Sequence, residues 1–109
     1  MRTVYHVSDA DAYHISEAKV RNLLGDETLD MTAAAVLIDH PGSIDAAAKG
    51  HRQTTEALVG MGATVKLCSN AFGGAEADED VFPDGVELVS SGVGELTRLQ
   101  NEGWVYIRL

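Results

Sequence analysis

The sequence TAAAVLI at residues 32–38 decides the fold class. After the opening threonine every residue in it is apolar, so it lacks the polar and apolar alternation of a strand with one face in water. A strand that is apolar on both sides is typical of a parallel sheet covered by helices on both faces. We therefore expect residues 32–38 to form a strand that is buried on both faces.

The segments on either side of this strand alternate between strand and helix patterns. Further strands are predicted at residues 3–7, 64–68, 86–89 and 104–109, and helices at 13–24, 44–60 and 93–102, with a turn at 39–43 and a short helix at 76–80. Strands that are separated by helical crossovers predict a mainly parallel sheet. The pattern thus indicates an α/β fold with five strands and with helices on both faces.

The length and composition predict one compact domain over residues 1–109. The chain is 45% hydrophobic and contains no repeat or low-complexity stretch, as in ordinary globular proteins. No apolar run approaches the roughly 20 residues that cross a bilayer, and the first residues lack the long apolar segment of a secretory signal. We expect a cytoplasmic protein that does not enter the membrane.

The charge balance narrows the range of partners. Asp and Glu number 17 and Lys and Arg only 8, which gives a formal net charge of −9 at pH 7. Such a surface repels phosphate backbones, so the sequence argues against nucleic-acid and anionic-membrane partners. Excess acid also keeps a protein hydrated in concentrated salt, which favours a halophilic source over the alternative of a merely acidic mesophile protein.

Small polar residues follow the first four predicted strands, in the loops at residues 8–11, 39–43, 68–70 and 90–92. In open parallel sheets, ligands bind at the carboxyl ends of the strands, so these loops form the predicted binding edge. Helix capping and turn formation are the alternative explanation for the same residue types. The candidate binding residues are Ser8, His40, Ser69, Asn70, Ser91 and Gly92.

Cys68 is the candidate catalytic residue. It is the only cysteine, which excludes an internal disulfide and fits a reducing compartment. It ends a predicted strand just before an asparagine and two glycines, whose backbone amides would stabilise a thiolate; the alternative is a buried cysteine that packs as a small hydrophobe. His40 is the histidine placed to approach it as a base, whereas His6 is predicted in the core and His14 and His51 on helix surfaces.

Three carboxylates offer a different chemistry. Asp9, Asp11 and Asp39 follow two predicted strands and would suit magnesium, as in receiver domains of two-component signalling. Those domains also carry a lysine after a late strand, and this chain has no lysine after Lys66. A phosphoacceptor role therefore ranks last, and neither a metal nor a cofactor is predicted.

The order of several segments resembles the DsrE/DsrF-like family, and in particular its small single-domain branch. The segments are TVKLCSN at residues 64–70, PDGVELV at 83–89, SGVGEL at 91–96 and LQNEGWVYIRL at 99–109. The resemblance implies a three-layer α/β/α sandwich over a five-stranded parallel sheet, assembled as a homo-oligomer, either a trimer or a hexamer. It also implies a cysteine at the end of the third strand, here Cys68, which carries a persulfide in the sulfur-relay members.

Two functions follow from these observations. The first is a sulfur carrier or sulfurtransferase-like relay protein, in which Cys68 takes sulfur from a donor protein and passes it to an acceptor protein. The residues after Cys68 differ from the relay pattern, so this role transfers to Cys68 by position alone. The alternative is a noncatalytic oligomeric module that binds a small ligand or a protein at the carboxyl ends of the strands.

Overall fold

Five parallel strands form one sheet in the computed structural model, which describes residues 1–109. The strands lie in the order β4-β3-β2-β1-β5, so the last strand of the chain pairs with the first. In this register Val4 of β1 lies between Ala35 of β2 and Tyr106 of β5. The strands are β1 (Arg2–Val7), β2 (Ala33–Ile38), β3 (Thr64–Cys68), β4 (Val86–Val89) and β5 (Val105–Arg108).

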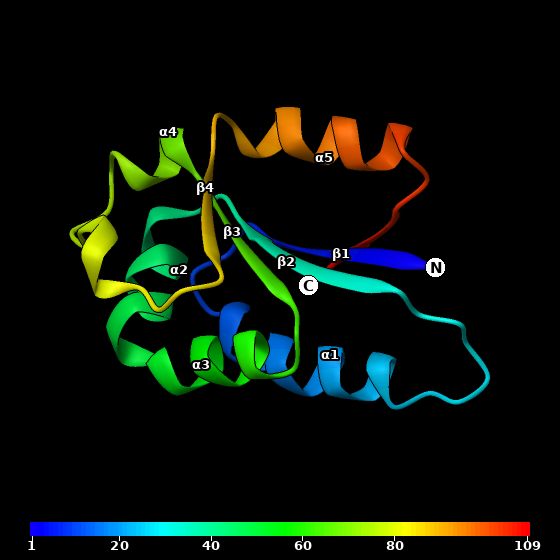
Figure 1. Cartoon of the computed structure of the whole chain (residues 1–109). Coiled ribbons are helices and arrows are strands. Elements are labelled where there is room, and N and C mark those ends of the chain that lie inside the picture. The colour runs from blue at the N-terminus through cyan, green and yellow to red at the C-terminus, as the bar shows by residue number, and fades with distance from the viewer.

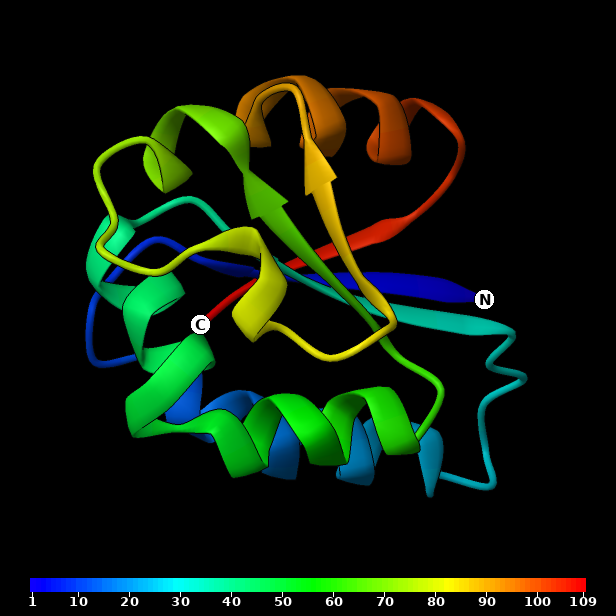
Figure 2. The same ribbon diagram turned by 60° about the vertical axis from the view of Figure 1, so that its left-hand side comes forward.

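Helices cover both faces of the sheet (Figures 1 and 2). Helices α1 (Ser16–Leu24) and α3 (Arg52–Gly60) lie on one face, and α5 (Gly92–Asn101) lies on the other. The shorter helices α2 (Pro41–Asp45) and α4 (Ser69–Phe72) follow β2 and β3 at the carboxyl ends of these strands. The expected α/β sandwich with a five-stranded parallel sheet is therefore confirmed.

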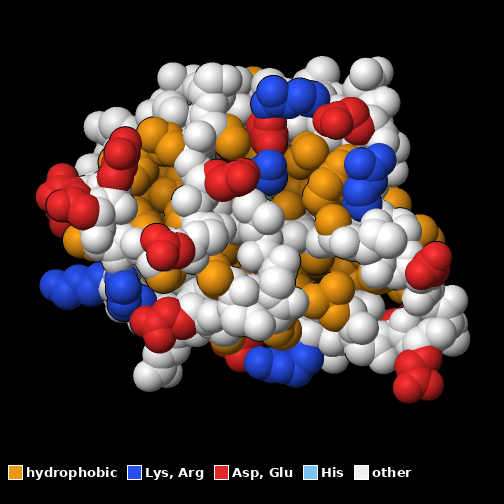
Figure 3. All heavy atoms as spheres, in the orientation of Figure 1, with side chains coloured by type: hydrophobic (Ala, Val, Ile, Leu, Met, Phe, Trp, Pro, Cys, Tyr) orange, Lys and Arg blue, Asp and Glu red, His pale blue; other side chains and the backbone are white.

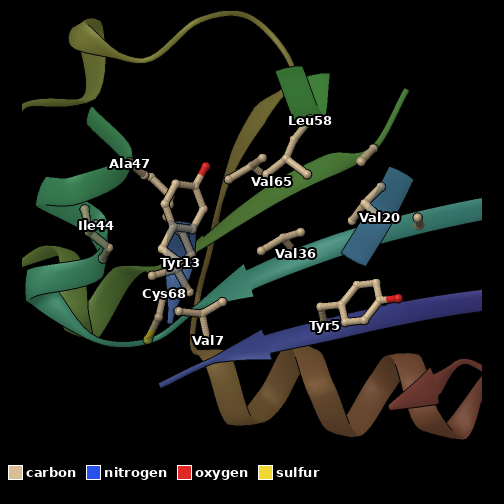
Figure 4. Packing of buried hydrophobic residues seen from close by; sticks show 14 of the residues in the cluster. Tyr5, Val7, Tyr13, Val20, Val36, Ile44, Ala47, Leu58, Val65 and Cys68 are labelled. Carbon is tan, nitrogen blue, oxygen red and sulfur yellow. The ribbon is translucent and has the colours of Figure 1, made fainter. Parts of the chain in front are cut away.

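The prediction for residues 32–38 holds because β2 is central. From Ala34 to Ile38 every residue of β2 is buried. Its alternate residues serve two cores: Val36 and Ile38 belong to a cluster of 15 buried residues on the α1 and α3 face, part of which is drawn in Figure 4. Ala35 and Leu37 belong to a cluster of 5 buried residues with Leu96 and Leu99 of α5.

The helix predicted over residues 44–60 is divided, and its start was wrong. Helix α2 begins at Pro41, where the turn was expected, because proline suits the first helical position and the His40 ring accepts a hydrogen bond from the Gly42 amide. A π-helical turn, Ala46–Gly50, follows and ends where the His51 amide donates to the Ala46 carbonyl at 2.6 Å. Thr55 fixes this turn from α3, since its hydroxyl donates to the Ala47 carbonyl at 2.7 Å.

The connection from β3 to β4 also differs from the prediction. Helix α4 begins directly after Cys68, and the expected helix at residues 76–80 is a 3-10 turn at Glu79–Val81. The Asp45 carboxylate anchors the loop between them, because it accepts hydrogen bonds from the amides of Glu76 and Ala77, both at 2.9 Å. These loop amides have no partner in a helix or strand, so a side chain from α2 supplies their hydrogen bonds.

None of the helices has the length and apolar character needed to cross a membrane.

Candidate functional site

Cys68 lies at the carboxyl end of β3 and precedes the first residue of α4. Only 6% of the residue is exposed, and its side chain belongs to the larger apolar cluster (Figure 4). No hydrogen bond to its sulfur is present, and its thiol is free. The predicted position of Cys68 at the end of a strand is therefore confirmed. Its low exposure is typical of a packed core cysteine and not of an exposed reactive one.

The start of α5 packs directly on Cys68 and Asp39. A Cβ atom placed on Gly92 would lie 3.5 Å from the Cβ of Cys68 and only 3.0 Å from the Cβ of Asp39. Glycine at this position therefore lets the first turn of α5 approach the ends of β2 and β3. The N-terminal end of α5, which carries the helix's partial positive charge, therefore lies beside Cys68.

Ser91 and Ser69 hold this end of the sheet in place. The Ser91 side chain caps α5 by accepting a hydrogen bond from the Gly94 amide at 3.0 Å, and this bond leaves the amides of Gly92 and Val93 unused. The Ser69 hydroxyl donates to the Val89 carbonyl at 2.6 Å and so ties the start of α4 to the end of β4. The side chains of these two predicted binding residues thus make hydrogen bonds that hold the elements next to Cys68 in place.

The other predicted binding residues do not meet at the cysteine. The His40 ring serves as the cap of α2, and no hydrogen bond joins it to Cys68. Asn70 is exposed on α4 and Ser8 is half-buried in the loop after β1, and the side chain of neither makes a hydrogen bond within the chain. A Cys68–His40 pair is therefore absent from this arrangement.

Three hydrogen-bonded side chains, those of Asp39, His6 and Tyr106, lie in a row across the carboxyl edge, which is the edge of the sheet where the parallel strands end and where Cys68 also lies. The His6 Nε2 atom lies 2.8 Å from Asp39 Oδ2, and the His6 Nδ1 atom lies 2.6 Å from the Tyr106 hydroxyl. His6 is satisfied, as expected for a strand histidine, but its partners are polar groups of two neighbouring strands and not the apolar core. These three side chains could not be grouped from the sequence, because they meet only when β5 pairs with β1.

The three aspartates considered as magnesium ligands do not converge. Asp39 bonds to His6, whereas the Asp9 carboxylate accepts from the Asp11 amide at 2.9 Å within its own loop. No group of three or more histidine, cysteine or acidic side chains is arranged to hold a metal ion. His14 and His51, both exposed as expected, stack with ring centroids 5.5 Å apart.

An ion-pair network lies under α5, on the same face of the sheet. Lys66 of β3 contacts Glu95 at 2.5 Å and Glu87 at 3.3 Å, and Arg98 also pairs with Glu95. Burial acts to raise the pKa of Glu95, yet the hydrogen bonds and charges of Lys66 and Arg98 leave that pKa below its ordinary value. Figure 3 shows charged groups of both signs near α5 and no gathered basic patch on that view.

A cleft of ≈ 520 Å³ lies elsewhere, between the loop after α4 and the β3–β4 edge. Leu67, Phe72 and Phe82 are among the apolar residues that line it, and Glu79, Asp80 and Asp84 supply carboxylates. Cys68 and the His6 chain are not among the lining residues. The candidate site at the carboxyl edge is therefore a surface assembled by strand ends and the start of α5, separate from this cleft.

These features define an α/β protein with an open parallel sheet and a polar site at the carboxyl ends of its strands. The solved structure of MTH1491 from Methanobacterium thermoautotrophicum, a protein of unknown function, is similar with 31% sequence identity and a TM-score of 0.83. The match covers 99% of this chain and 98% of that chain, so the chain belongs to the same family as MTH1491. No protein-family model matches the sequence, and no curated protein matches it.

Proposed function

We propose that the protein is a DsrE/DsrF-like sulfur carrier in which Cys68 holds a persulfide. The observation that carries this proposal is the approach of α5 to the cysteine, with 3.5 Å between the Cys68 Cβ and the Cβ position of Gly92. The cysteine thus lies beside the positive end of a ten-residue helix, which is a setting used by reactive cysteines, whose nucleophilic form is the thiolate. The resemblance of residues 64–70 and 99–109 to the family supports the same role.

The transfer needs two displacement steps. The Cys68 thiolate attacks the outer sulfur of a donor persulfide, a new S–S bond forms on Cys68 as the S–S bond of the donor breaks, and the donor leaves as a thiolate. An acceptor thiolate then attacks the outer sulfur on Cys68, which restores the Cys68 thiolate. The partners are thus a sulfur donor protein and a sulfur acceptor protein, and the reducing cytoplasm is the proposed location.

The burial of Cys68 supports a second candidate. With 6% of the residue exposed, the sulfur is reached only by a small donor or after the start of α5 moves. A noncatalytic module that binds a small ligand or a protein at the carboxyl edge requires no such access. In that case Cys68 packs beneath the site and remains unreactive.

A homo-oligomer, either a trimer or a hexamer, belongs to the same proposal. Strand β5 is an edge strand, and all four of its residues are exposed, including Val105 and Ile107. Exposed apolar side chains on an open edge strand are the kind of surface that a second copy covers.

Sulfur loading separates the two candidates. The folded protein is treated with a sulfane-sulfur donor, and intact mass spectrometry follows the gain of one sulfur atom. The carrier predicts a gain that is lost in Cys68→Ser and reversed by a thiol acceptor, and the single cysteine makes the assignment unambiguous. If the folded protein stays unmodified while the urea-unfolded protein is modified, the binding module replaces the carrier.

A further inference from the structure

The side chains of Asp39, His6 and Tyr106 form a hydrogen-bonded row in which an imidazole lies between a carboxylate and a phenol. The distances are 2.8 Å from Asp39 Oδ2 to His6 Nε2 and 2.6 Å from His6 Nδ1 to the Tyr106 hydroxyl. The His6 and Tyr106 rings lie 5.6 Å apart between centroids and are tilted by 52°. A nucleophile or acid within hydrogen-bond reach of a base, with the base oriented by a third group, is the general arrangement of activated side chains.

Three adjacent strands build this arrangement. Asp39 follows β2, His6 lies in β1 and Tyr106 lies in β5, and these strands are neighbours in the sheet. The register sets Tyr106 beside Val4, whose side chain packs against α5, so His6 and Tyr106 lie on the α5 face. Val105 and Ile107 alternate to the opposite face, so a partner that covers them leaves the Tyr106 hydroxyl on the other side of the sheet.

The hydrogen-bond partners of a neutral His6 indicate which ring nitrogen carries the proton. A carboxylate only accepts, so a neutral His6 that bonds to Asp39 donates from Nε2 and carries a lone pair on Nδ1. Tyr106 must then donate its hydroxyl proton to Nδ1. The second carboxylate oxygen, Asp39 Oδ1, is buried and has no hydrogen-bond partner, so His6 is the one side chain that compensates the Asp39 charge. This leaves Asp39 available to stabilise a positive charge on His6.

Of the three hydrogen-bonded side chains, that of Tyr106 is the one that faces the solvent. It is 38% exposed, whereas 13% of the His6 side chain and 20% of the Asp39 side chain are exposed. Arg108 lies opposite His6 in the β1–β5 register and makes no ion pair within the chain. Arg108 thus follows Tyr106 by two residues on the same side of β5, and a cation without an ion-pair partner there, on a protein with a net charge of −9, favours a small anionic ligand.

We propose that Tyr106 is an activated phenol and acts as the acid–base group of a Tyr106–His6–Asp39 relay. Its ligand class is a small anion that carries an exchangeable hydroxyl or thiol proton, held by Arg108. In the forward direction the Tyr106 proton moves to His6 Nδ1, the imidazolium is stabilised by Asp39, and the phenolate accepts the proton of the ligand. Reversal returns each proton, and no electrons are exchanged. The relay does not depend on sulfur transfer at Cys68.

Acetylation with N-acetylimidazole tests the activation, because the reagent transfers its acetyl group to a phenolic oxygen and releases imidazole. Peptide mapping at neutral pH gives the rate at each tyrosine, with the buried Tyr5 and Tyr13 as internal controls. We expect Tyr106 to react at least about tenfold faster than N-acetyltyrosine amide, a threshold set below the roughly hundredfold that a positioned base contributes at the lower end of its range. His6→Gln keeps a polar side chain but accepts no proton and should remove the enhancement.

Asp39 is a positioning residue in this relay, and the His6 tautomer is its readout. Nitrogen NMR of the wild-type imidazole should show Nε2 protonated and Nδ1 unprotonated. Asp39→Asn should mix the two tautomers and lower the Tyr106 acetylation rate several-fold, while Glu17→Gln on α1 should change neither. A Tyr106 rate at or below that of the model compound, or a wild-type tautomer protonated on Nδ1, would overturn the proposal even if one variant fails to fold.

Discussion

The Lys66 ammonium group lies 2.5 Å from the Glu95 carboxylate, and this ion pair joins β3 to the buried side of α5. The Lys66 side chain is 13% exposed and that of Glu95 is 6% exposed, so neither charge is fully solvated. A buried pair of this kind is costly to break, because the remaining partner keeps its charge in a poorly hydrated place. The pair also positions α5, whose first residue packs on Cys68.

Glu95→Gln should lower the free energy of unfolding by roughly 2–3 kcal/mol at neutral pH, because Lys66 then keeps only its contact with the exposed Glu87. The pKa of Glu95 is lowered in the folded protein. Its contribution is therefore complete above the ordinary value of 4.5 and is lost as the pH falls through the folded pKa. Urea unfolding at a series of pH values should show wild type and variant converging in acid. A difference that grows in acid would contradict this assignment.

Thr55→Val should destabilise the protein by roughly 1–3 kcal/mol, because it leaves the Ala47 carbonyl and the Tyr13 hydroxyl without their buried partner. Tyr13→Phe is the matched control, since it removes the hydroxyl that Thr55 contacts at 2.6 Å but leaves the bond to Ala47 intact. Thermal unfolding of both variants measures the difference. Equal losses would show that the π-helical turn does not depend on Thr55.

The buried Tyr13 hydroxyl should make the stability of the protein depend on pH in the alkaline range. Burial raises the pKa of Tyr13 to about 12 from an ordinary value of 10.0. A raised pKa of this kind stabilises the fold below pH 10.0, and that contribution is lost as the pH rises toward the folded pKa. Unfolding measured across this range should show the wild type losing stability more steeply than Tyr13→Phe. Parallel curves would place the base sensitivity elsewhere.

Gly92→Ala should lower stability by about 1–3 kcal/mol, because the new methyl group would lie 3.0 Å from the Cβ of Asp39 and force α5 outward. The same shift should raise the rate at which Cys68 reacts with a thiol reagent, since the sulfur becomes less covered. Gly60→Ala in α3 is the matched control, because nothing lies within 4 Å of its added methyl group. It should leave Cys68 unchanged and stabilise α3 by up to about 1 kcal/mol.

Ile107→Lys should shift the protein toward the monomer, because it places a charge on the exposed apolar side of β5. Size-exclusion chromatography with light scattering, carried out in high salt to suit the acidic surface, measures the mass. Val93→Lys is the control, since Val93 is an exposed apolar residue of α5 outside that strand, with 71% exposure. A wild-type protein that is monomeric under the same conditions would exclude the proposed assembly.

The fold was predictable because its signal is local. Residues 32–38 lack alternation, and this alone indicated the doubly covered strand that β2 proves to be. The break in the second helix was not predictable, because the π-helical turn depends on Thr55 reaching back to Ala47. The glycine at position 50 is unfavourable inside a helix, but glycine alone does not reveal where the chain bends.

Part of the candidate site was predictable from the sequence, and part of it depends on the order of the strands. The location of Cys68, Ser69, Ser91 and Gly92 at one edge of the sheet was predictable, because the carboxyl ends of parallel strands meet at the same edge. The contact of His6 with Tyr106 is not predictable from the sequence, because the sequence does not determine the order of strands in the sheet. Only the pairing of β5 with β1 brings Tyr106 to His6.

The pairing of β5 with β1 also sets the time at which this protein acquires its polar site. His6 and Tyr106 are separated by 100 positions in the chain, so a ribosome releases β1 long before the strand that carries the phenol. A folding intermediate in which β1 to β4 have assembled but β5 has not docked would hold His6 beside Asp39 with its Nδ1 atom open to water. The bond between His6 and Tyr106 can form only when β5 has paired with β1, so this histidine reports on the completion of the sheet at that edge.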